Sequence, residues 1–366
     1  MGIYIEPGKE FTGKCGKVHR IAVEKVLVGK DAIHNIPDIG REFGSGKRTV
    51  LVGDDLTRKM FIGSITDLFD EKHRPEILTI RTSTMEEVES LASKIGKNDL
   101  PFAVGGGAVI DTVKLASHRR GVRFVSVPTT PSHDGMVSPT ASITVDGKKT
   151  TQNAFPPVAA VFDLKILSGA PERMISAGYG DVFAKFTSLK DWELAHVNRN
   201  EYYCQDSVDA STMTLHDTVE SVLSRGMDIE TVCYGVINSG LSMVLAGTSR
   251  PESGSEHMVS HYIDQNAPVR AMHGEQVALA VLLLSAYHRE KNGLWWKETN
   301  YQPEGIMDIM KRVGLPVTFG SIGTTGETVA HALVEEPLNR PDKYTILHKF
   351  PFDIGGAKEF VRLNCN

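Results

Sequence analysis

The sequence predicts an α/β protein with an amino-terminal, doubly wound parallel sheet and an all-helical carboxyl-terminal domain. Short β-rich runs alternate with helical stretches up to about residue 163, and beyond it apolar residues recur mainly at helical spacing. A hydrophobic share of 41% and a charged share of 23% are typical of a folded globular chain. We therefore expect domains over residues 1–163 and 164–366, with an active site in the cleft between them.

Four runs in the first domain are predicted to be strands, and two stretches between them are predicted to be helices. The strands cover 48–53, 76–80, 100–104 and 122–127, and the helices cover 84–95 and 109–118. Ser83 or Thr84 is the expected N-cap of the first helix. This alternation is typical of a Rossmann-like sheet. Asp146-Gly147, between 141–145 and 148–151, predicts a hairpin with a tight turn.

The second domain is predicted to be helical throughout. Its clearest helices are 182–194, 211–223 and 274–287. The longest apolar run, Val277 to Ala286, is shorter than the roughly 20 residues of a membrane-spanning helix, so we expect a buried core helix and no membrane span. Such an apolar helical half favours a homo-oligomer, but it identifies no interface.

Charge and cysteine usage narrow the class of protein further. The formal net charge of −5 argues against a broad nucleic-acid-binding surface. Cys15, Cys204, Cys233 and Cys365 are scattered and form no CxxC pair, so they do not indicate a disulfide framework. We expect reduced thiols and a cytoplasmic protein.

The first candidate site is the turn Gly105-Gly106-Gly107, which follows a predicted strand and opens a predicted helix. Glycines let a backbone approach phosphate closely, and a helix N-terminus offers free N–H groups to a pyrophosphate. The alternative is a simple tight turn. Asp54 ends an earlier strand and is expected either to accept from a cofactor ribose or to cap the following helix. Arg58 and Lys59 lie close by and would tolerate a 2′-phosphate, so NAD and NADP both stay open.

Two further segments carry chemistry. Residues 126–135 follow a strand and are rich in hydroxyls suited to a dinucleotide, although the composition also fits an ordinary polar loop. Asp181 is expected at a helix start, and His257 and His261, four residues apart, share one helix face. One carboxylate and two imidazoles, His273 included, with an open fourth position are typical of a catalytic zinc site. The absence of HExxH argues against a zincin protease.

Five segments resemble the dehydroquinate synthase and iron-type alcohol dehydrogenase superfamily and, within it, the sn-glycerol-1-phosphate dehydrogenase family. They are VGGGAVIDTVKLAS, SVPTTPSHDGMVSPTAS, SAGYGDVFAKFTSLKDWELA, SGSEHMVSHYID and MHGEQVALA. They span residues 104–280 in the expected order. The PSHDG loop and the GDVFAK…DW stretch are the most specific to the second family. Ala108 departs from the Ser that many superfamily members carry there.

The resemblance implies a role for each matching residue. Asp181, His257 and His273 would hold Zn²⁺, Asp134, Asp181 and His261 would contact substrate, and Asp181 and His261 would be the catalytic groups. NAD(H) or NADP(H) would be bound by Asp54, Gly107, Ala108, Val109, Ile110, Asp111, Thr129, Thr130, Ser132 and Ser138.

The resemblance also implies a reaction: reversible, zinc-assisted reduction of dihydroxyacetone phosphate to sn-glycerol 1-phosphate, for archaeal-type membrane phospholipid synthesis. Lys185 and His133 are the candidates for the substrate phosphate. A glycerol dehydrogenase would need no phosphate pocket. A dehydroquinate-synthase-like lyase would need more cations than Lys148 and Lys149 offer after Asp134. A nucleotide-binding protein with a structural His cluster is the alternative that is not an enzyme.

Overall fold

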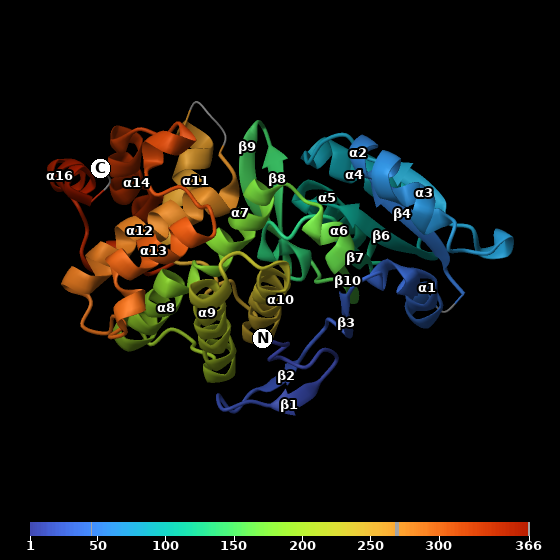
Figure 1. The fold of residues 1–366 in the computed structure, drawn as a ribbon, viewed down its shortest axis with the longest axis horizontal. Helices are drawn as coiled ribbons and strands as arrows, with labels where there is room; N and C mark the ends of the chain where they lie inside the picture. Colours follow the sequence, from blue (N-terminus) through green and yellow to red (C-terminus); the bar gives the residue numbers. More distant parts are fainter. Residues whose placement is uncertain (45, 268–270, 365–366) are drawn as a thin grey trace. The chain divides into compact units, whose positions relative to one another are not determined.

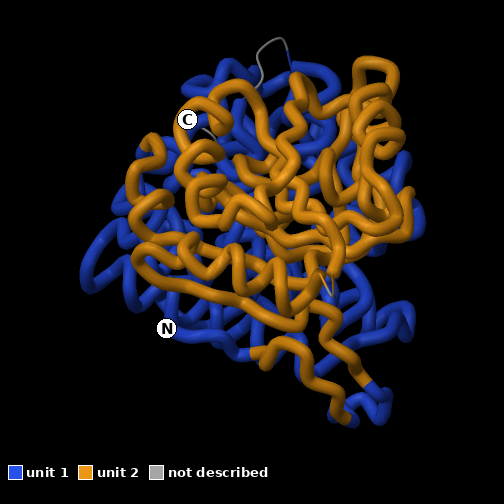
Figure 2. Tube along the Cα trace, turned by 90° about the vertical axis from the view of Figure 1, so that its right-hand side faces the viewer, with its two compact units in different colours: residues 1–4, 12–18, 172–366 blue, residues 5–11, 19–171 orange. Residues whose placement is uncertain are grey.

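The computed structural model describes residues 1–44, 46–267 and 271–364, and the chain divides into two compact units (Figure 2). One unit comprises Ile5–Phe11 and His19–Pro171, and the other comprises Met1–Tyr4, Thr12–Val18 and the chain from Glu172 on. The first unit thus continues beyond residue 163, through the short helix α6 (Leu164–Ser168). Strands β1 (Glu10–Thr12) and β2 (Val18–Arg20) form a small two-stranded sheet.

A six-stranded sheet forms the centre of the first unit, in the order β3-β10-β7-β6-β4-β5 (Figure 1). Each neighbouring pair of strands is parallel. The strands are β3 (Lys25–Gly29), β4 (Arg48–Gly53), β5 (Glu76–Thr79), β6 (Asp99–Gly105), β7 (Val125–Pro128) and β10 (Ala159–Asp163).

Helices cover both faces of this sheet. They are α1 (Ile36–Gly44), α2 (Asp55–Thr57), α3 (Gly63–Thr66), α4 (Met85–Lys94) and α5 (Gly107–Arg120), with helical turns at Ala32–Asn35, Arg58–Ile62, Glu71–His73 and Asp134–Met136. Ile36 and Ile39 of α1 join Leu51, Phe102 and further strand side chains in one buried cluster. Successive side chains of a strand point to opposite faces of the sheet. Helix α5 packs against β6 and β7 on the face opposite to α1. The predicted doubly wound fold is confirmed.

The predicted elements of this unit are present within a few residues of their expected ends. The predicted hairpin consists of β8 (Thr140–Val145) and β9 (Lys148–Asn153), with left-handed φ angles of 49° at Asp146 and 79° at Gly147. Strands β3 and β10 are not among the predicted strands. Strand β10 begins with two alanines, which favour strands weakly.

The second unit is helical, as predicted (Figure 1). Its helices are α7 (Glu172–Val182), α8 (Lys185–Arg199), α9 (Gln205–Arg225), α10 (Ile229–Ala246), α11 (Ser255–Asn266), α12 (His273–Lys291), α13 (Pro303–Arg312), α14 (Gly326–Asn339), α15 (Ile346–Lys349) and α16 (Ile354–Asn364), with turns at Thr299–Tyr301 and Phe319–Ile322. Helix α12 contains the apolar run Val277 to Ala286 and packs against α7, α8, α11, α13 and α16. This run is the buried core helix that its length predicts.

Three further expectations concern single features of this unit. The prediction that Asp181 begins a helix is wrong, because Asp181 is the next-to-last residue of α7. Gly178 and Gly180 suggest a helix break, but they lie inside the helix. Helix α10 has the length and hydropathy of a membrane span, and 78% of it is buried inside the protein. Cys15, Cys204 and Cys233 take part in no disulfide among the described residues, and Cys365 lies outside those residues.

Candidate metal and substrate site

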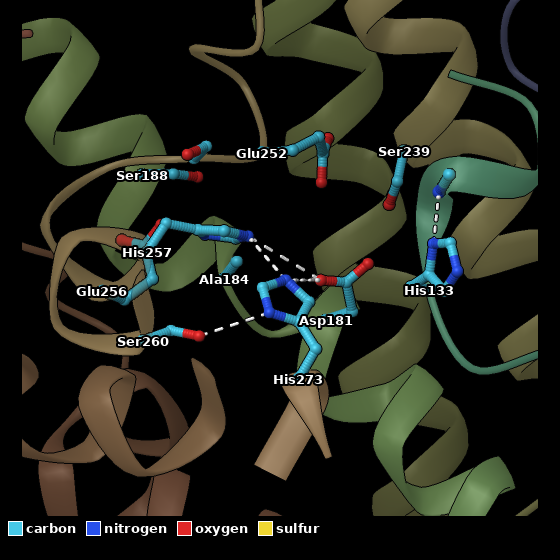
Figure 3. Close-up of polar contacts among 12 residues, drawn as sticks. His133, Asp181, Ala184, Ser188, Ser239, Glu252, Glu256, His257, Ser260 and His273 are labelled. Carbon is cyan, nitrogen blue, oxygen red and sulfur yellow. Dashed lines mark hydrogen bonds and ion pairs between the residues drawn. The ribbon is translucent and has the colours of Figure 1, made fainter. Parts of the chain in front are cut away.

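Three side chains from three helices converge in the helical unit. Asp181 of α7, His257 of α11 and His273 of α12 place one ligand atom each within 4.8 Å of the others. Figure 3 shows the three side chains pointing toward one another. The Nε2 atoms of the two histidines are 3.2 Å apart. Asp181 Oδ1 lies 3.5 Å from His273 Nε2 and 3.9 Å from His257 Nε2. Two imidazoles and one carboxylate at this spacing form a donor set for a transition-metal ion.

A close approach of two helix backbones brings Asp181 next to His273. Gly180 precedes Asp181, and a Cβ at Gly180 would lie 2.1 Å from the carbonyl oxygen of Gly274. Gly274 follows His273, and a Cβ there would lie 1.8 Å from the carbonyl oxygen of Ala177. Helices α7 and α12 can pack this tightly only because both positions lack a side chain. Gly180 and Gly274 therefore allow the close helix contact that brings Asp181 next to His273.

Asp191 fixes the start of α11, the helix that carries His257. Its Oδ2 accepts from the backbone N–H of Ser255 at 2.7 Å, and its Oδ1 accepts from the N–H of Ile346 at the same distance. Burial alone would raise the pKa of Asp191, but the nearby His288 and the hydrogen bonds from Ser255 lower it overall. Asp191, in the DW segment, is therefore a residue that positions the helix carrying His257.

A buried carboxylate orients the imidazole of His257. His257 Nδ1 lies 2.8 Å from Glu256 Oε1, and Thr187 donates to Glu256 Oε2 at 2.6 Å. Burial and the nearby Asp191 raise the pKa of Glu256 to about 7, against the hydrogen bonds from Thr187 and Gly254. With Nδ1 held by Glu256, the lone pair of Nε2 faces the cluster, as a metal ligand requires.

A second chain of hydrogen bonds orients His273. Its Nδ1 lies 3.2 Å from Ser260 Oγ, and Ser260 donates to Gln276 Oε1 at 2.8 Å. Gln276 in turn donates from Nε2 to Asp264 Oδ1 at 3.0 Å. Since the Ser260 proton is used toward Gln276, Ser260 accepts from His273 Nδ1–H, and Nε2 of His273 is also left to bind metal.

His261 lies beside the cluster but outside the ligand set. Its ring centroid is 6.1 Å from that of His257, and its buried Nδ1 has no hydrogen-bond partner among the described residues. Burial lowers the pKa of His261 well below its usual range, and the charge of Arg340 and the neighbouring histidines act in the same direction. The side chain is a neutral imidazole with one nitrogen still to be satisfied, which suits a polar ligand.

The candidate cofactor segments follow adjacent strands of the sheet in the other unit. Strand β4 lies between β5 and β6. The chain adds β5 on one side of β4 and every later strand on the other side, so the order of strand addition reverses at β4. Open α/β sheets bind ligands at the carboxyl ends of strands at such a switch point. Asp54 follows β4, and Gly106 and Gly107 follow β6. The two segments therefore meet at the sheet edge where a nucleotide is expected.

The surroundings of the glycine turn favour a phosphate contact. Gly106 is the N-cap of α5, and no side chain caps this helix start. A Cβ at Gly106 would meet only Thr130 Oγ1, at 3.3 Å, whereas a Cβ at Gly107 would lie 1.9 Å from His133 Nε2. Asp54 caps α2 by accepting from Thr57 N at 2.8 Å, so the helix-cap interpretation of Asp54 is correct and a ribose contact stays a prediction.

The other predicted cofactor residues differ in what they offer. Val109 and Ile110 are core side chains and Ala108 is exposed, so these three would contribute backbone groups. The remaining side chains lie in one hydroxyl-rich stretch: Thr130 and Ser132 are 3.5 Å apart, Ser138 and Thr140 are 3.2 Å apart, and Thr129 is buried.

Asp111 has a structural task that the sequence does not reveal. Its Oδ1 pairs with Lys114 Nζ at 3.2 Å and its Oδ2 accepts from the backbone N–H of Ser142 at 3.0 Å. The fully buried Lys114 also donates to the carbonyl oxygens of Gly135 and Thr140. This pair holds the loop that contains Asp134 against α5.

The two residues expected to bind phosphate are already engaged. Lys185 is fully buried and donates to Glu252 Oε2 and Ser239 Oγ, both at 2.5 Å. His133 Nδ1 accepts from the backbone N–H of Gly135 at 2.9 Å. Lys185 in particular has its charge neutralised by a buried carboxylate. Sequence reasoning missed four residues that support the site: Lys114, Asp191, Glu256 and Ser260. All four stand inside the segments that carry the resemblance, which is the signal that could have identified them.

Residues 27–171 match the model of the iron-containing alcohol dehydrogenase family. Glycerol-1-phosphate dehydrogenases (NAD(P)+) from Pyrococcus horikoshii and Methanosarcina mazei are 34% and 36% identical to this chain over 331 and 330 residues. These alignments cover 89% and 88% of this chain and 92% and 89% of the relatives.

The solved structures that resemble this chain support the fold. Glycerol dehydrogenase from Schizosaccharomyces pombe has a TM-score of 0.72 at 20% identity and covers 93% of this chain and 88% of its own. The iron-containing alcohol dehydrogenase from Thermococcus thioreducens has a TM-score of 0.70 at 15% identity, covering 93% and 97%. At the level of sequence, the likeness over nine-tenths of the chain is decisive: this chain belongs to the glycerol-1-phosphate dehydrogenase family, within the iron-type alcohol dehydrogenase superfamily.

Proposed function

We propose that this chain catalyses the reversible, NAD(P)H-dependent reduction of dihydroxyacetone phosphate to sn-glycerol 1-phosphate. The observation that carries the proposal is the cluster of Asp181, His257 and His273 in a chain of this family. A glycerol dehydrogenase with the same cluster would act on the unphosphorylated substrate, so the two functions differ in whether the phosphate is recognised.

Asp181, His257 and His273 would hold a zinc ion. The fit rests on the two histidines, whose Nδ1 atoms are engaged by Glu256 and Ser260 so that both Nε2 atoms face Asp181. When bound, zinc supplies a Lewis acid for the ketone oxygen without any redox change of its own. Two histidines and a carboxylate also suit ferrous iron, which makes metal identity a matter for measurement.

The chain's own side chains would orient the substrate and handle its proton. The neutral His261 has an unsatisfied Nδ1 that can accept from a substrate hydroxyl. The product oxygen requires a proton, which His261, a water molecule or a substrate hydroxyl would deliver. Asp134, held in its loop by the Lys114 contacts to Gly135 and Thr140, would bind a substrate hydroxyl.

The dinucleotide would bind at the switch point of the parallel sheet. The uncapped start of α5 and the space beside Gly106 suit its pyrophosphate. Asp54, the backbone from Gly107 to Asp111, and the hydroxyls of Thr129, Thr130, Ser132 and Ser138 would contact the rest of the cofactor. When bound, the nicotinamide supplies the hydride that reduces the carbonyl carbon.

One set of assays tests this function. Purified protein loaded with zinc is supplied with NADH or NADPH and with dihydroxyacetone phosphate, dihydroxyacetone or a heptulosonate phosphate. We expect oxidation of the cofactor with dihydroxyacetone phosphate, and a product that a stereospecific assay identifies as sn-glycerol 1-phosphate. Preference for dihydroxyacetone would instead identify a glycerol dehydrogenase, and phosphate release from the heptulosonate would identify a lyase.

The wider setting follows from the reaction. The product would enter synthesis of archaeal-type membrane phospholipids. We propose a cytoplasmic location, in keeping with the lack of a disulfide among Cys15, Cys204 and Cys233. Self-association into a homo-oligomer is a further proposal, which sedimentation of the purified protein tests.

A further inference from the structure

The loop between α14 and α15 is anchored beside the metal-site helix. Asp191 accepts from Ile346 N with one carboxylate oxygen and from Ser255 N with the other. Thr345 Oγ1 lies 3.8 Å from the sulfur of Met258, the residue after His257. One buried carboxylate therefore ties the end of this loop to the start of α11, and the loop keeps a fixed place next to the proposed metal ligands.

Lys343 is the cation that this loop presents, and its partners are hydroxyls. Its Nζ donates to Ser253 Oγ at 2.6 Å and lies 3.4 Å from Ser249 Oγ. Within the part of the chain that the structure describes, no carboxylate forms an ion pair with this ammonium. Ser253 stands in the segment that leads into α11, four residues before His257. A positive charge is thus held close to the metal cluster by groups that do not neutralise it.

Two other buried cations of this unit are neutralised by carboxylates. Arg250 forms a paired contact with Glu201 at 2.6 and 2.5 Å, and Lys185 pairs with Glu252 at 2.5 Å. Arg340, at the start of the same loop, donates from Nε to Glu336 at 3.0 Å. The structure gives its terminal Nη groups no acceptor among the described residues. Lys343, three residues after Arg340, is therefore a cation with which an added anion can form an ion pair.

Electrostatic effects agree with this location. Burial lowers the pKa of the Lys343 ammonium to about 7, although Glu256 opposes the shift. A desolvated ammonium without a counter-ion is costly, and a bound anion removes that cost.

We propose that Lys343, with Ser253 and the guanidinium of Arg340, binds the phosphate group of the substrate. This assignment rests on the proposed function, because only a phosphorylated substrate needs the subsite. It replaces Lys185 and His133, which the sequence favours for that role. Lysine serves as a point charge for phosphate, and hydroxyl and guanidinium donors satisfy the remaining oxygens.

The test compares Lys343→Met with Lys343→Arg and with the control Lys349→Met, which removes the same charge from the exposed Lys349 on α15. The probe is inorganic phosphate, whose affinity is measured by calorimetry and by inhibition against dihydroxyacetone phosphate. We expect Lys343→Met to weaken phosphate binding and to raise the KM for dihydroxyacetone phosphate by about 10- to 100-fold, the loss typical of a hydrogen bond to a charged group. The KM for dihydroxyacetone, the metal content and the melting temperature should stay near wild type.

Partial rescue in Lys343→Arg would support a charge-based role, because arginine retains the cation. Equal losses for dihydroxyacetone and its phosphate, or unchanged phosphate affinity in Lys343→Met, would overturn the assignment. If wild-type protein fails to reduce dihydroxyacetone phosphate yet binds inorganic phosphate through Lys343, the proposed function fails and the anion subsite stands.

Discussion

Gly274→Ala is expected to destroy the metal site without changing a ligand. The added Cβ would lie 1.8 Å from the carbonyl oxygen of Ala177 and 2.6 Å from its carbonyl carbon. Both atoms belong to the backbone of α7, so no side chain can rotate away to make room. Helices α7 and α12 must move apart, and they carry Asp181 and His273.

The required movement is large compared with what a metal site tolerates. The distance of 1.8 Å reaches ordinary van der Waals contact only if the two helix backbones move apart by about 1.5 Å. Metal–ligand bonds tolerate only about 0.2 Å. We therefore expect metal affinity to fall by at least on the order of 100-fold. The overpacking itself should destabilise the fold by about 1–3 kcal/mol.

The assay compares metal content after dialysis and the melting temperature with and without zinc. Wild-type protein should gain about 2.7 kcal/mol at zinc concentrations near 100 times Kd, and Gly274→Ala should gain far less. Gly63→Ala is the matched control, because it adds the same methyl group on α3 with nothing within 4 Å. A Gly274→Ala protein that retains wild-type zinc affinity would refute this account of how the two helices meet.

Five further variants or treatments test the rest of the site. Prolonged chelation should abolish activity, and about one zinc per chain should restore it; restoration by iron alone would refute zinc. His261→Ala should retain zinc while turnover falls by on the order of a hundred- to ten-thousand-fold. His257→Ala should lose both zinc and turnover. Loss of zinc in His261→Ala with zinc retained in His257→Ala would show that the two roles are exchanged. Gly106→Ala, whose Cβ meets only Thr130 at 3.3 Å, should raise the cofactor KM about 10-fold at an unchanged melting temperature; unchanged affinity would remove the turn from the cofactor site. Lys114→Met should lower the free energy of unfolding by about 3 kcal/mol, measured in urea, and a loss under about 1 kcal/mol would contradict the clamp.

Local sequence patterns predicted the elements whose signal is local. Alternation of short apolar runs and helices identified β4 to β7 with α4 and α5, and the Asp146-Gly147 pair identified the hairpin of β8 and β9. They did not identify β3 and β10, whose stability comes from pairing with each other and with β7. Nor did they place Asp181 correctly, because the glycines beside it serve a helix contact that is distant in sequence.

The basic residues explain why the phosphate site was the hardest part to predict from sequence. Lys185 lies in a family-specific segment, and proximity to Asp181 in sequence made it the natural candidate. Whether a cation can bind a phosphate depends on which carboxylates fold against it. Glu252, 67 residues away in sequence, pairs with Lys185 and neutralises its charge. The role proposed for Lys343 arises in the opposite way, because folding places its ammonium against Ser249 and Ser253 and not in an ion pair with a carboxylate. The proposed anion site thus depends on the absence of a carboxylate at ion-pair distance from Lys343 among the described residues, and that absence is a property of the tertiary structure and not of any one segment.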